Sequence, residues 1–318
     1  MNLTVGRDEF EEALVKNLII VGLAVIINCI NGTIIMTFCR KAVFHTESRY
    51  ILYMNLVVND MIMVCSSVIM YVLTYAHPVF EASFCLILVV VGSTTTMNTP
   101  IILAGMAIER YIAICKPLHH TQICTVRRTY VLIGLTWGMG LIPALVDVVI
   151  VRAVRSAGFF STAVFCYYIV IYNTRYHRQK AQVVQAMYMS FVWLSLIYTY
   201  LRIFLTAKAA TDDSGSASKA QNTILLQCML SYLPPLVDSF LLSYFPAYRT
   251  KITFLFFLLT NIVPRLLSPL IYGLRDKTFA KHMSRYYSCG RVCCSKGKRK
   301  RKKLSLGSSN KRVGSLKT

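Results

Sequence analysis

Residues 106–120 read MAIERYIAICKPLHH. An apolar helical segment ends there in an adjacent acid and base, Glu109 and Arg110, and an apolar patch, a Lys-Pro pair and two histidines follow. Ionisable residues near a membrane helix mark a functional site by default. The alternative is a helix end whose arginine reaches the lipid headgroups, and taken alone the stretch favours that alternative. The sequence on either side of it decides between the two.

Apolar segments long enough to cross a bilayer run through the whole chain. Of its 318 residues 55% are hydrophobic and only 15% are charged, against about 25% charged in a typical soluble domain. A spanning helix needs about 20 apolar residues, and in lipid its backbone groups must be satisfied internally. The sequence therefore predicts an all-α membrane protein with seven transmembrane helices in one bundle. The predicted spans are 17–39, 51–75, 84–108, 129–151, 183–206, 223–244 and 252–274.

These spans divide the chain into four regions. Residues 1–16 form a polar N-terminus, 17–274 the bundle, 275–288 a short amphipathic helix on the membrane surface, and 289–318 a basic tail. Four acids precede the first apolar run, where a signal peptide would carry basic residues. The first span is therefore expected to be an uncleaved anchor.

The net charge of +22 is distributed unevenly between the two sides of the membrane. The tail and the loops after spans one, three and five hold 24 Lys and Arg, and the opposite side holds 9. The positive-inside rule then places the N-terminus outside and the tail in the cytoplasm. We expect the chain at the plasma membrane. Without the tail the two sides are equal, so the orientation depends on it. The basic run at 296–303 is expected to attract anionic lipid and not nucleic acid.

Several residues outside the spans are candidates for modification. Asn2 begins an Asn-Leu-Thr glycosylation sequence on the predicted outer side. Cys85 and Cys166 also lie outside, where a disulfide can persist. The eleven cysteines show no zinc-binding spacing, so we expect no metal and no cofactor. Juxtamembrane cysteines in the tail are candidates for palmitoylation; they are Cys289, Cys293 and Cys294.

The segment at 106–120 resembles the MAxDRYxAICxPLxY signature of odorant receptors, within the rhodopsin-like seven-helix receptors, and most closely a teleost branch. Other matches follow in order along residues 15–283. They are Asn31, the LVVND at 56–60, Cys85 placed 25 residues before Arg110, Cys166, Trp137, the YLRI at 200–203 and the SPLIY at 268–272. Each match is weak alone, but together, in order and at this spacing, they are specific.

The resemblance implies a chemosensory G-protein-coupled receptor with a Cys85–Cys166 disulfide. Glu109 and Arg110 would pair at rest, and activation would free Arg110 toward a heterotrimeric G protein, of the stimulatory olfactory type. Tyr111, Tyr200 and Tyr272 would complete this switch.

A line of polar residues is expected inside the bundle. The resemblance implies that Asp60 is an activation-linked acid that binds sodium, and the alternative is a protonated, hydrogen-bonded carboxyl. Arg265 departs from the family pattern: it shares a helix face with Pro269 and Tyr272 at i, i+4 and i+7. We therefore expect an Asp60–Arg265 ion pair in place of sodium. Asn31, Ser268 and Pro269 complete the line.

The resemblance places a ligand in the outer half of the bundle. The candidate lining residues are Ser93, Thr96, Met97, Asp238, Phe240, Phe257 and Asn261. Ordinary helix packing is the alternative for each. Span three offers no acid at this level, so an amine held by a carboxylate there is not expected. A mostly apolar lining suits a small organic odorant.

The sixth predicted span matches the family poorly, because Lys219 lies only 15 residues before Pro234, about one turn short. The sequence leaves two other classes of protein to consider, a transporter or channel and a membrane enzyme. A transporter or channel would show paired broken helices or repeats, and an enzyme would need clustered nucleophiles, bases or metal ligands within the spans; the sequence shows neither.

Overall fold

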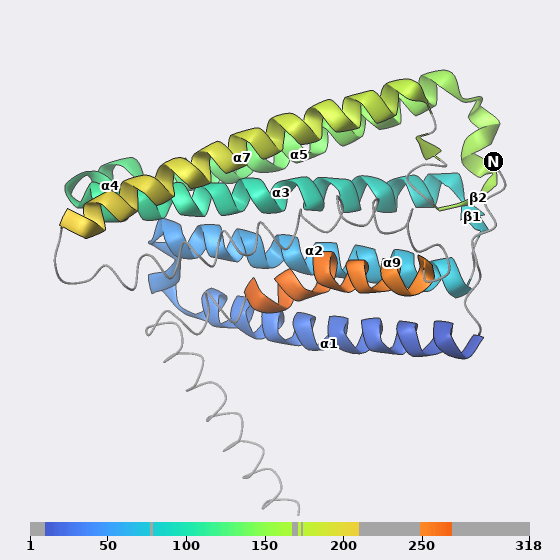
Figure 1. Ribbon diagram of the computed structural model, residues 1–318, viewed down its shortest axis with the longest axis horizontal. Helices are drawn as coiled ribbons and strands as arrows, with labels where there is room; N and C mark the ends of the chain where they lie inside the picture. Colours follow the sequence, from blue (N-terminus) through green and yellow to red (C-terminus); the bar gives the residue numbers. More distant parts are fainter. Residues whose placement is uncertain (1–9, 77–78, 167–170, 173, 210–248, 269–318) are drawn as a thin grey trace, which may run out of the picture. The chain divides into compact units, whose positions relative to one another are not determined.

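The computed structural model describes residues 10–76, 79–166, 171–172, 174–209 and 249–268. Long helices dominate this part of the chain (Figure 1). They are α1 (Phe10–Arg40), α2 (Ser48–Ala76), α3 (Ala82–Cys115), α5 (Val126–Val154), α7 (Arg175–Ala209) and α9 (Arg249–Phe257), which continues through the π-helical η4 (Leu258–Ile262). Shorter elements connect them: η1 (Ala42–His45), β1 (Val79–Glu81), α4 (Pro117–Ile123), η2 (Ala157–Ser161) and β2 (Ala163–Phe165).

Six helices within the described residues are long and apolar enough to cross a membrane. They contain the predicted spans one to five and most of the seventh, and so confirm the all-α prediction for these segments. The predicted sixth span, 223–244, lies outside the described residues. The last of the six helices, 251–268, stops where the description ends.

Helix α3 lies at the centre of the described helices. It packs against α2, α5 and α7, while α1 packs on α2, and η4 contacts α1 and α2. In the most apolar part of α3, 61% of the residues are buried, against 22% in α5 and α7. Large apolar side chains on α5 and α7 are exposed, such as Val149 and Leu194. This is the pattern of a bundle whose outer helices face lipid.

A proline explains how α5 and α7 are joined. Pro143 has no N–H, so the carbonyl of Met139 four residues earlier lacks its helical donor. The Tyr188 hydroxyl of α7 donates to this carbonyl at 2.7 Å. One turn further along α5, Lys180 donates to the Pro143 carbonyl and its Nζ lies 2.7 Å from Asp147 Oδ1.

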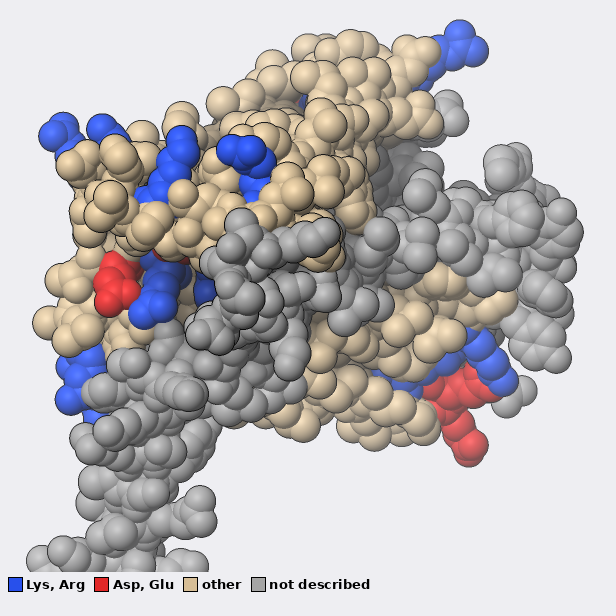
Figure 2. Space-filling view, turned by 60° about the vertical axis from the view of Figure 1, so that its left-hand side comes forward, with Lys and Arg blue, Asp and Glu red and all other residues tan. Residues whose placement is uncertain are grey.

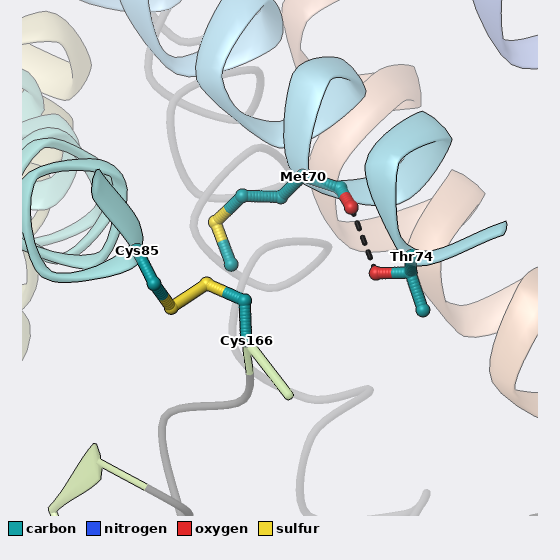
Figure 3. Close-up of a disulfide and its surroundings, with 4 residues drawn as sticks. All are labelled: Met70, Thr74, Cys85 and Cys166. Atoms are coloured by element: carbon teal, nitrogen blue, oxygen red, sulfur yellow. Dashed lines mark hydrogen bonds between the residues drawn. A yellow bond between two sulfur atoms is a disulfide. The ribbon is translucent and has the colours of Figure 1, made fainter. Parts of the chain in front are cut away.

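One end of the bundle, here called the disulfide end, is closed by β1, β2 and a disulfide. The two strands pair antiparallel, with Phe80 opposite Val164. Cys85 at the start of α3 is bonded to Cys166 just after β2, with their Cα atoms 5.5 Å apart, so the predicted pair is present. The side chain of Met70 on α2 lies against this disulfide (Figure 3). The opposite end, which carries η1 and α4, is called the α4 end.

Candidate functional site

A buried ion pair joins α2 to the helix that follows η4, residues 263–268. Asp60 and Arg265 are 1% and 2% exposed, and Arg265 Nε lies 3.5 Å from Asp60 Oδ1. Burying either charge alone would be costly, and pairing offsets that cost. The expected ion pair is therefore formed, and a guanidinium occupies the position beside the acid that a bound sodium ion would need. These residues do not fit a sodium site.

The other nitrogens of Arg265 are also bound. Nη2 donates to Thr99 Oγ1 on α3 at 3.2 Å, and it lies 2.8 Å from Met63 Sδ on α2. Nη1 donates to the carbonyl of Thr260 at 3.1 Å. One guanidinium thus connects α2, α3 and its own helix.

The π-helical turn η4 explains part of this geometry. Its wide turn is closed by a bond from the Val263 N–H to the Leu258 carbonyl, one residue longer than in an α-helix. The Thr260 carbonyl within this turn accepts from the side chain of Arg265. Single π turns inside α-helices are frequent at functional sites. No pattern in the sequence predicted the π-helical turn η4.

Thr99 and Asn59 extend the cluster into α3. The Thr99 hydroxyl donates to the Thr95 carbonyl at 3.1 Å and accepts from Asn59 Nδ2 at 3.0 Å and from Arg265. One donor and two lone pairs are all that a hydroxyl has, so Thr99 is saturated. Neither Thr99 nor the role of Asn59 was predicted from the sequence. The i, i+4 spacing of Thr95 and Thr99 on one face of α3 was the signal available.

Of the other residues predicted in the polar line, the structure describes Asn31 and Ser268. Asn31 of α1 is fully buried, and its amide has no hydrogen bond within the described part of the chain. The Ser268 hydroxyl donates to the Pro264 carbonyl at 3.0 Å and lies beside Asp60. Pro269 lies outside the described residues. Trp137 of α5 donates to Asn55 Oδ1 on α2 at 2.9 Å, a polar contact between two helices that both border α3.

The acid at the end of α3 has a different partner from the one expected. Glu109 is 6% exposed, and its Oε1 lies 3.0 Å from Nε2 of His120 on α4. Within the described residues no ion pair joins Glu109 to Arg110, so the expected resting pair is absent from this structure. Adjacent residues on a helix do not face each other. Among the described residues Arg110 therefore has no ion-pair partner.

Tyr111 at the end of α3 contacts α7 through Tyr198. Its ring lies edge-on to that of Tyr198, with centroids 5.8 Å apart, and Arg202 interacts electrostatically with both hydroxyls. Tyr200 instead stacks on Phe204 of its own helix. Residues two apart on a helix point to nearly opposite sides, so α7 presents only one of the two tyrosines to α3. Tyr272, the third member of the predicted switch, lies outside the described residues.

The expected ligand-lining residues on α3 are half-buried. The Ser93 and Thr96 hydroxyls donate to carbonyls within α3, those of Val90 and Gly92, and the Met97 side chain is also half-buried. Asn261 Nδ2 donates to Thr260 Oγ1 at 2.9 Å.

Phe257 has a packing role. Its ring lies 5.1 Å from that of Tyr71 on α2, and it covers an apolar cluster of α1 and α2 that contains Ile27 and Val64. For Phe257 these contacts agree with ordinary helix packing, which was the alternative to ligand binding. Asp238 and Phe240 lie outside the described residues, as do Asn2 and the three tail cysteines.

A third buried acid, Asp147, lies nearer the disulfide end and was not predicted from the sequence. Asp147 of α5 binds Lys180, and His177 Nε2 lies 3.7 Å from the same carboxylate oxygen. The Thr174 hydroxyl accepts from the His177 backbone N–H and contacts ring Nδ1, so the simplest arrangement has Thr174 donating to Nδ1 and Nε2–H facing Asp147. The lone acid in the fourth apolar segment was the available signal.

Basic side chains are spread over the α4 end, which Figure 2 turns toward the viewer, with acids in only one place among them. In the described part of the chain, no group of three or more His, Cys, Asp or Glu residues is arranged to hold a metal ion. The described part of the α4 end is therefore mainly cationic at its surface, while the described interior holds the Asp60–Arg265 and Asp147–Lys180 ion pairs.

Comparison with known proteins gives a consistent result. Residues 30–273 match the model of the family described as 7 transmembrane receptor (rhodopsin family). The chain is 28% identical to Odorant receptor 131-2 of Danio rerio over 299 residues, which cover 92% of each protein. It is 24% identical to Olfactory receptor 2A25 of Homo sapiens over 78% of this chain and 82% of that receptor. It is also 24% identical to human Olfactory receptor 4K15, over 81% of each.

Proposed function

The chain belongs to the 7 transmembrane receptor (rhodopsin) family, and from this premise we propose that it is an odorant receptor that activates a stimulatory olfactory-type G protein. The observation that carries this proposal is the similarity to Odorant receptor 131-2 along 92% of both chains. The protein is a multi-pass membrane receptor with a small-molecule ligand and a G-protein partner. This family match favours a receptor over the transporter or channel considered from the sequence.

The proposed ligand site is in the half of the bundle nearer the disulfide. Ser93, Thr96 and Met97 on α3, with Asn261 beyond α9, would contact a small organic odorant, together with Asp238 and Phe240. The described α3 residues at this level carry no charge, and a lining with few polar groups suits an uncharged or weakly polar molecule.

A continuous series of contacts leads from that site into the bundle. Asn261 bonds Thr260, the Thr260 carbonyl accepts from Arg265, and Arg265 pairs with Asp60 and bonds Thr99 of α3. A ligand that contacts Asn261 would therefore act on the π-helical turn and on the arginine that joins three helices. Coupling of this kind needs an element with two arrangements that the ligand binds unequally. We assign that role to η4 and Arg265.

At the α4 end Arg110 would engage the G protein, since it is unpaired within the described chain and lies on a cationic surface. The disulfide supports an extracellular location for the opposite end, because disulfides persist in oxidising environments. The proposal therefore places the N-terminus with Asn2 outside at the plasma membrane. The tail with Cys289, Cys293 and Cys294 would lie in the cytoplasm, where lipidation and anionic lipid would hold it to the membrane.

The test is cAMP accumulation in cells that express the full chain, an olfactory-type stimulatory G protein and a trafficking helper, against an odorant panel. Surface expression is measured in parallel through an N-terminal tag, which also tests the orientation. An odorant-dependent rise that Arg110→Ala abolishes at equal surface expression is the expected result. Odorant-gated ion flux that persists in Arg110→Ala would instead favour a channel.

A further inference from the structure

A cluster of cations and hydroxyls lies between α3 and α7 at the α4 end. Arg202 of α7 interacts with the hydroxyls of Tyr111 and Tyr198, and the charge of Lys116, just beyond the end of α3, acts on the Tyr111 hydroxyl. These four residues are here called the Arg202 cluster. Within the described part of the chain neither cation forms an ion pair, and no described acid acts on the two tyrosines or on Arg202. The cluster therefore offers two positive charges and two hydroxyls, with no described carboxylate to neutralise them.

The backbone of α7 at Arg202 is fixed against the end of α3, which leaves the side chain for another role. The Cys115 thiol of α3 lies 3.9 Å from the Arg202 carbonyl and 3.3 Å from the Thr206 hydroxyl. Thr206 donates to the same carbonyl at 2.9 Å. Arg202 itself is exposed. A guanidinium carries five N–H donors in a planar arrangement that matches the oxygens of a phosphate, and two phenol oxygens do not occupy all of them.

The Arg202 cluster borders the side of α7 that faces lipid. Large side chains with mostly apolar surface are exposed along this side at helical spacing; they are Met187, Phe191, Leu194, Tyr198 and Leu205. Arg202 lies four residues after Tyr198, so it continues the same side of the helix. The apolar segment of α7 ends at Thr206, one turn further on. At that depth an arginine keeps its aliphatic part in the hydrocarbon and extends its charged group to the lipid headgroups.

We propose that the Arg202 cluster binds the phosphate headgroup of an anionic phospholipid in the leaflet at the α4 end, and that the bound headgroup joins α3 to α7. Basic sites between transmembrane helices bind such headgroups on the cytoplasmic side, where anionic lipids are concentrated. The cytoplasmic position of the α4 end belongs to the proposed function. The occupant is a lipid and not an acidic segment of the G protein, because the exposed neighbours of Arg202 on α7, Leu201 and Leu205, are apolar and face hydrocarbon.

The test is photo-crosslinking of lipid to the full chain in nanodiscs. The discs contain phosphatidylcholine and a small share of a lipid with a diazirine on one acyl chain, either phosphatidylserine or phosphatidylcholine, and the labelled peptides are identified by mass spectrometry. Phosphatidylserine should label residues 198–206 about fivefold more than phosphatidylcholine does, the effect expected of one cation at an anionic headgroup. Both leaflets of a disc have the same composition, so this result does not depend on the orientation of the receptor.

Three variants locate the site. Arg202→Gln should remove the preference for phosphatidylserine at 198–206, whereas Arg202→Lys keeps the charge and should retain most of it. Arg127→Gln is the matched control, because Arg127 is an exposed arginine of α5 at the same end that does not act on Tyr111 or Arg202; it should keep the full preference. Labelling of the basic run at 296–303 should be equal in all samples, which controls for the amount of anionic lipid and for intact protein.

The outcomes separate the possible occupants. Equal labelling of 198–206 by the two lipids, or the same preference in the wild type and in Arg202→Gln, would overturn the proposal. Glycerophosphoserine, which has the headgroup without acyl chains, should not compete; full competition would assign the site to a free phosphate compound and not to a lipid. Unchanged lipid labelling in Arg202→Gln, with reduced nucleotide exchange on a purified G protein, would assign Arg202 to the G-protein interface instead. The labelling itself needs neither odorant nor G protein, so it stands or falls independently of the proposed function.

Discussion

Two of the three buried acids in the described bundle, Asp60 and Glu109, are paired with different kinds of base. Asp60 lies deep between α2, α3 and the helix after η4, and its base comes from a residue 205 positions away in the sequence. Glu109 lies at the α4 end, and its base comes from a short helix eleven residues later. The first base is an arginine, which stays charged at every physiological pH, and the second is a histidine, which does not.

The difference shows what each contact is suited to do. The guanidinium of Arg265 bonds three helices at once, so breaking it disturbs the packing of the bundle. The imidazole of His120 holds one short surface helix and is partly solvated, so its contact is weak and reversible. The buried Asp60–Arg265 pair is therefore expected to stabilise the packing of the bundle, whereas the partly exposed Glu109–His120 pair is expected to affect only the position of α4. The following changes test that distinction, from the largest expected effect to the smallest.

Arg265→Ala should have the largest effect, because it leaves the Asp60 carboxylate buried without its partner. Removing one member of a buried pair typically costs about 3–5 kcal/mol, so surface expression should fall sharply and the apparent Tm of the purified receptor should drop. Asp60→Asn should also destabilise, by leaving the guanidinium unpaired. The double variant Asp60→Asn/Arg265→Ala should cost less than the sum of the two. Strict additivity, with expression intact in both single variants, would show that the pair does not exist in the membrane.

A substitution at a buried position without charge tests whether close helix packing affects stability as strongly as the buried ion pair does. A Cβ at Gly140 of α5 would overlap Asn98 Oδ1 and lie 3.1 Å from the Thr94 carbonyl, both on α3. Gly140→Ala should therefore push α5 from α3 or force Asn98 to move, at about 1–3 kcal/mol. Gly138→Ala is the matched control on the same helix, since nothing lies within 4 Å of its Cβ. Thermal unfolding followed by tryptophan fluorescence measures both, and equal Tm values would contradict the close approach.

The sequence was sufficient for features that depend on hydropathy or on a shared pattern. Six described helices follow from apolar length alone, and the Cys85–Cys166 pairing followed from the resemblance. The Asp60–Arg265 pair was reachable because Arg265 departs from a pattern whose geometry is known. In each case the information is either local or carried by an ordered set of matches.

Features that depend on how a helix is rotated, or on polar residues at a helix end, could not be predicted from the sequence. Helix α7 begins at Arg175, eight residues before the apolar segment predicts, because its first two turns are polar and show no hydropathy signal. Asp147 therefore had no visible partner in Lys180. The contact of Tyr111 with Tyr198 depends on how α7 is rotated about its axis, which hydropathy does not show. The pairing of Glu109 with His120 instead of Arg110 depends on a seven-residue helix, α4, that begins at Pro117.

The smallest expected effect belongs to the pair at the α4 end. Partly exposed ion pairs contribute about 0–1 kcal/mol, so His120→Ala should shift the apparent Tm by no more than a few degrees and leave surface expression close to that of the wild type. Thermal unfolding of His120→Ala beside Arg265→Ala, in one preparation and at one pH, gives the direct comparison. A loss in His120→Ala as large as that in Arg265→Ala would mean that α4 is part of the structural core, and the division between a deep structural pair and a peripheral adjustable one would fail.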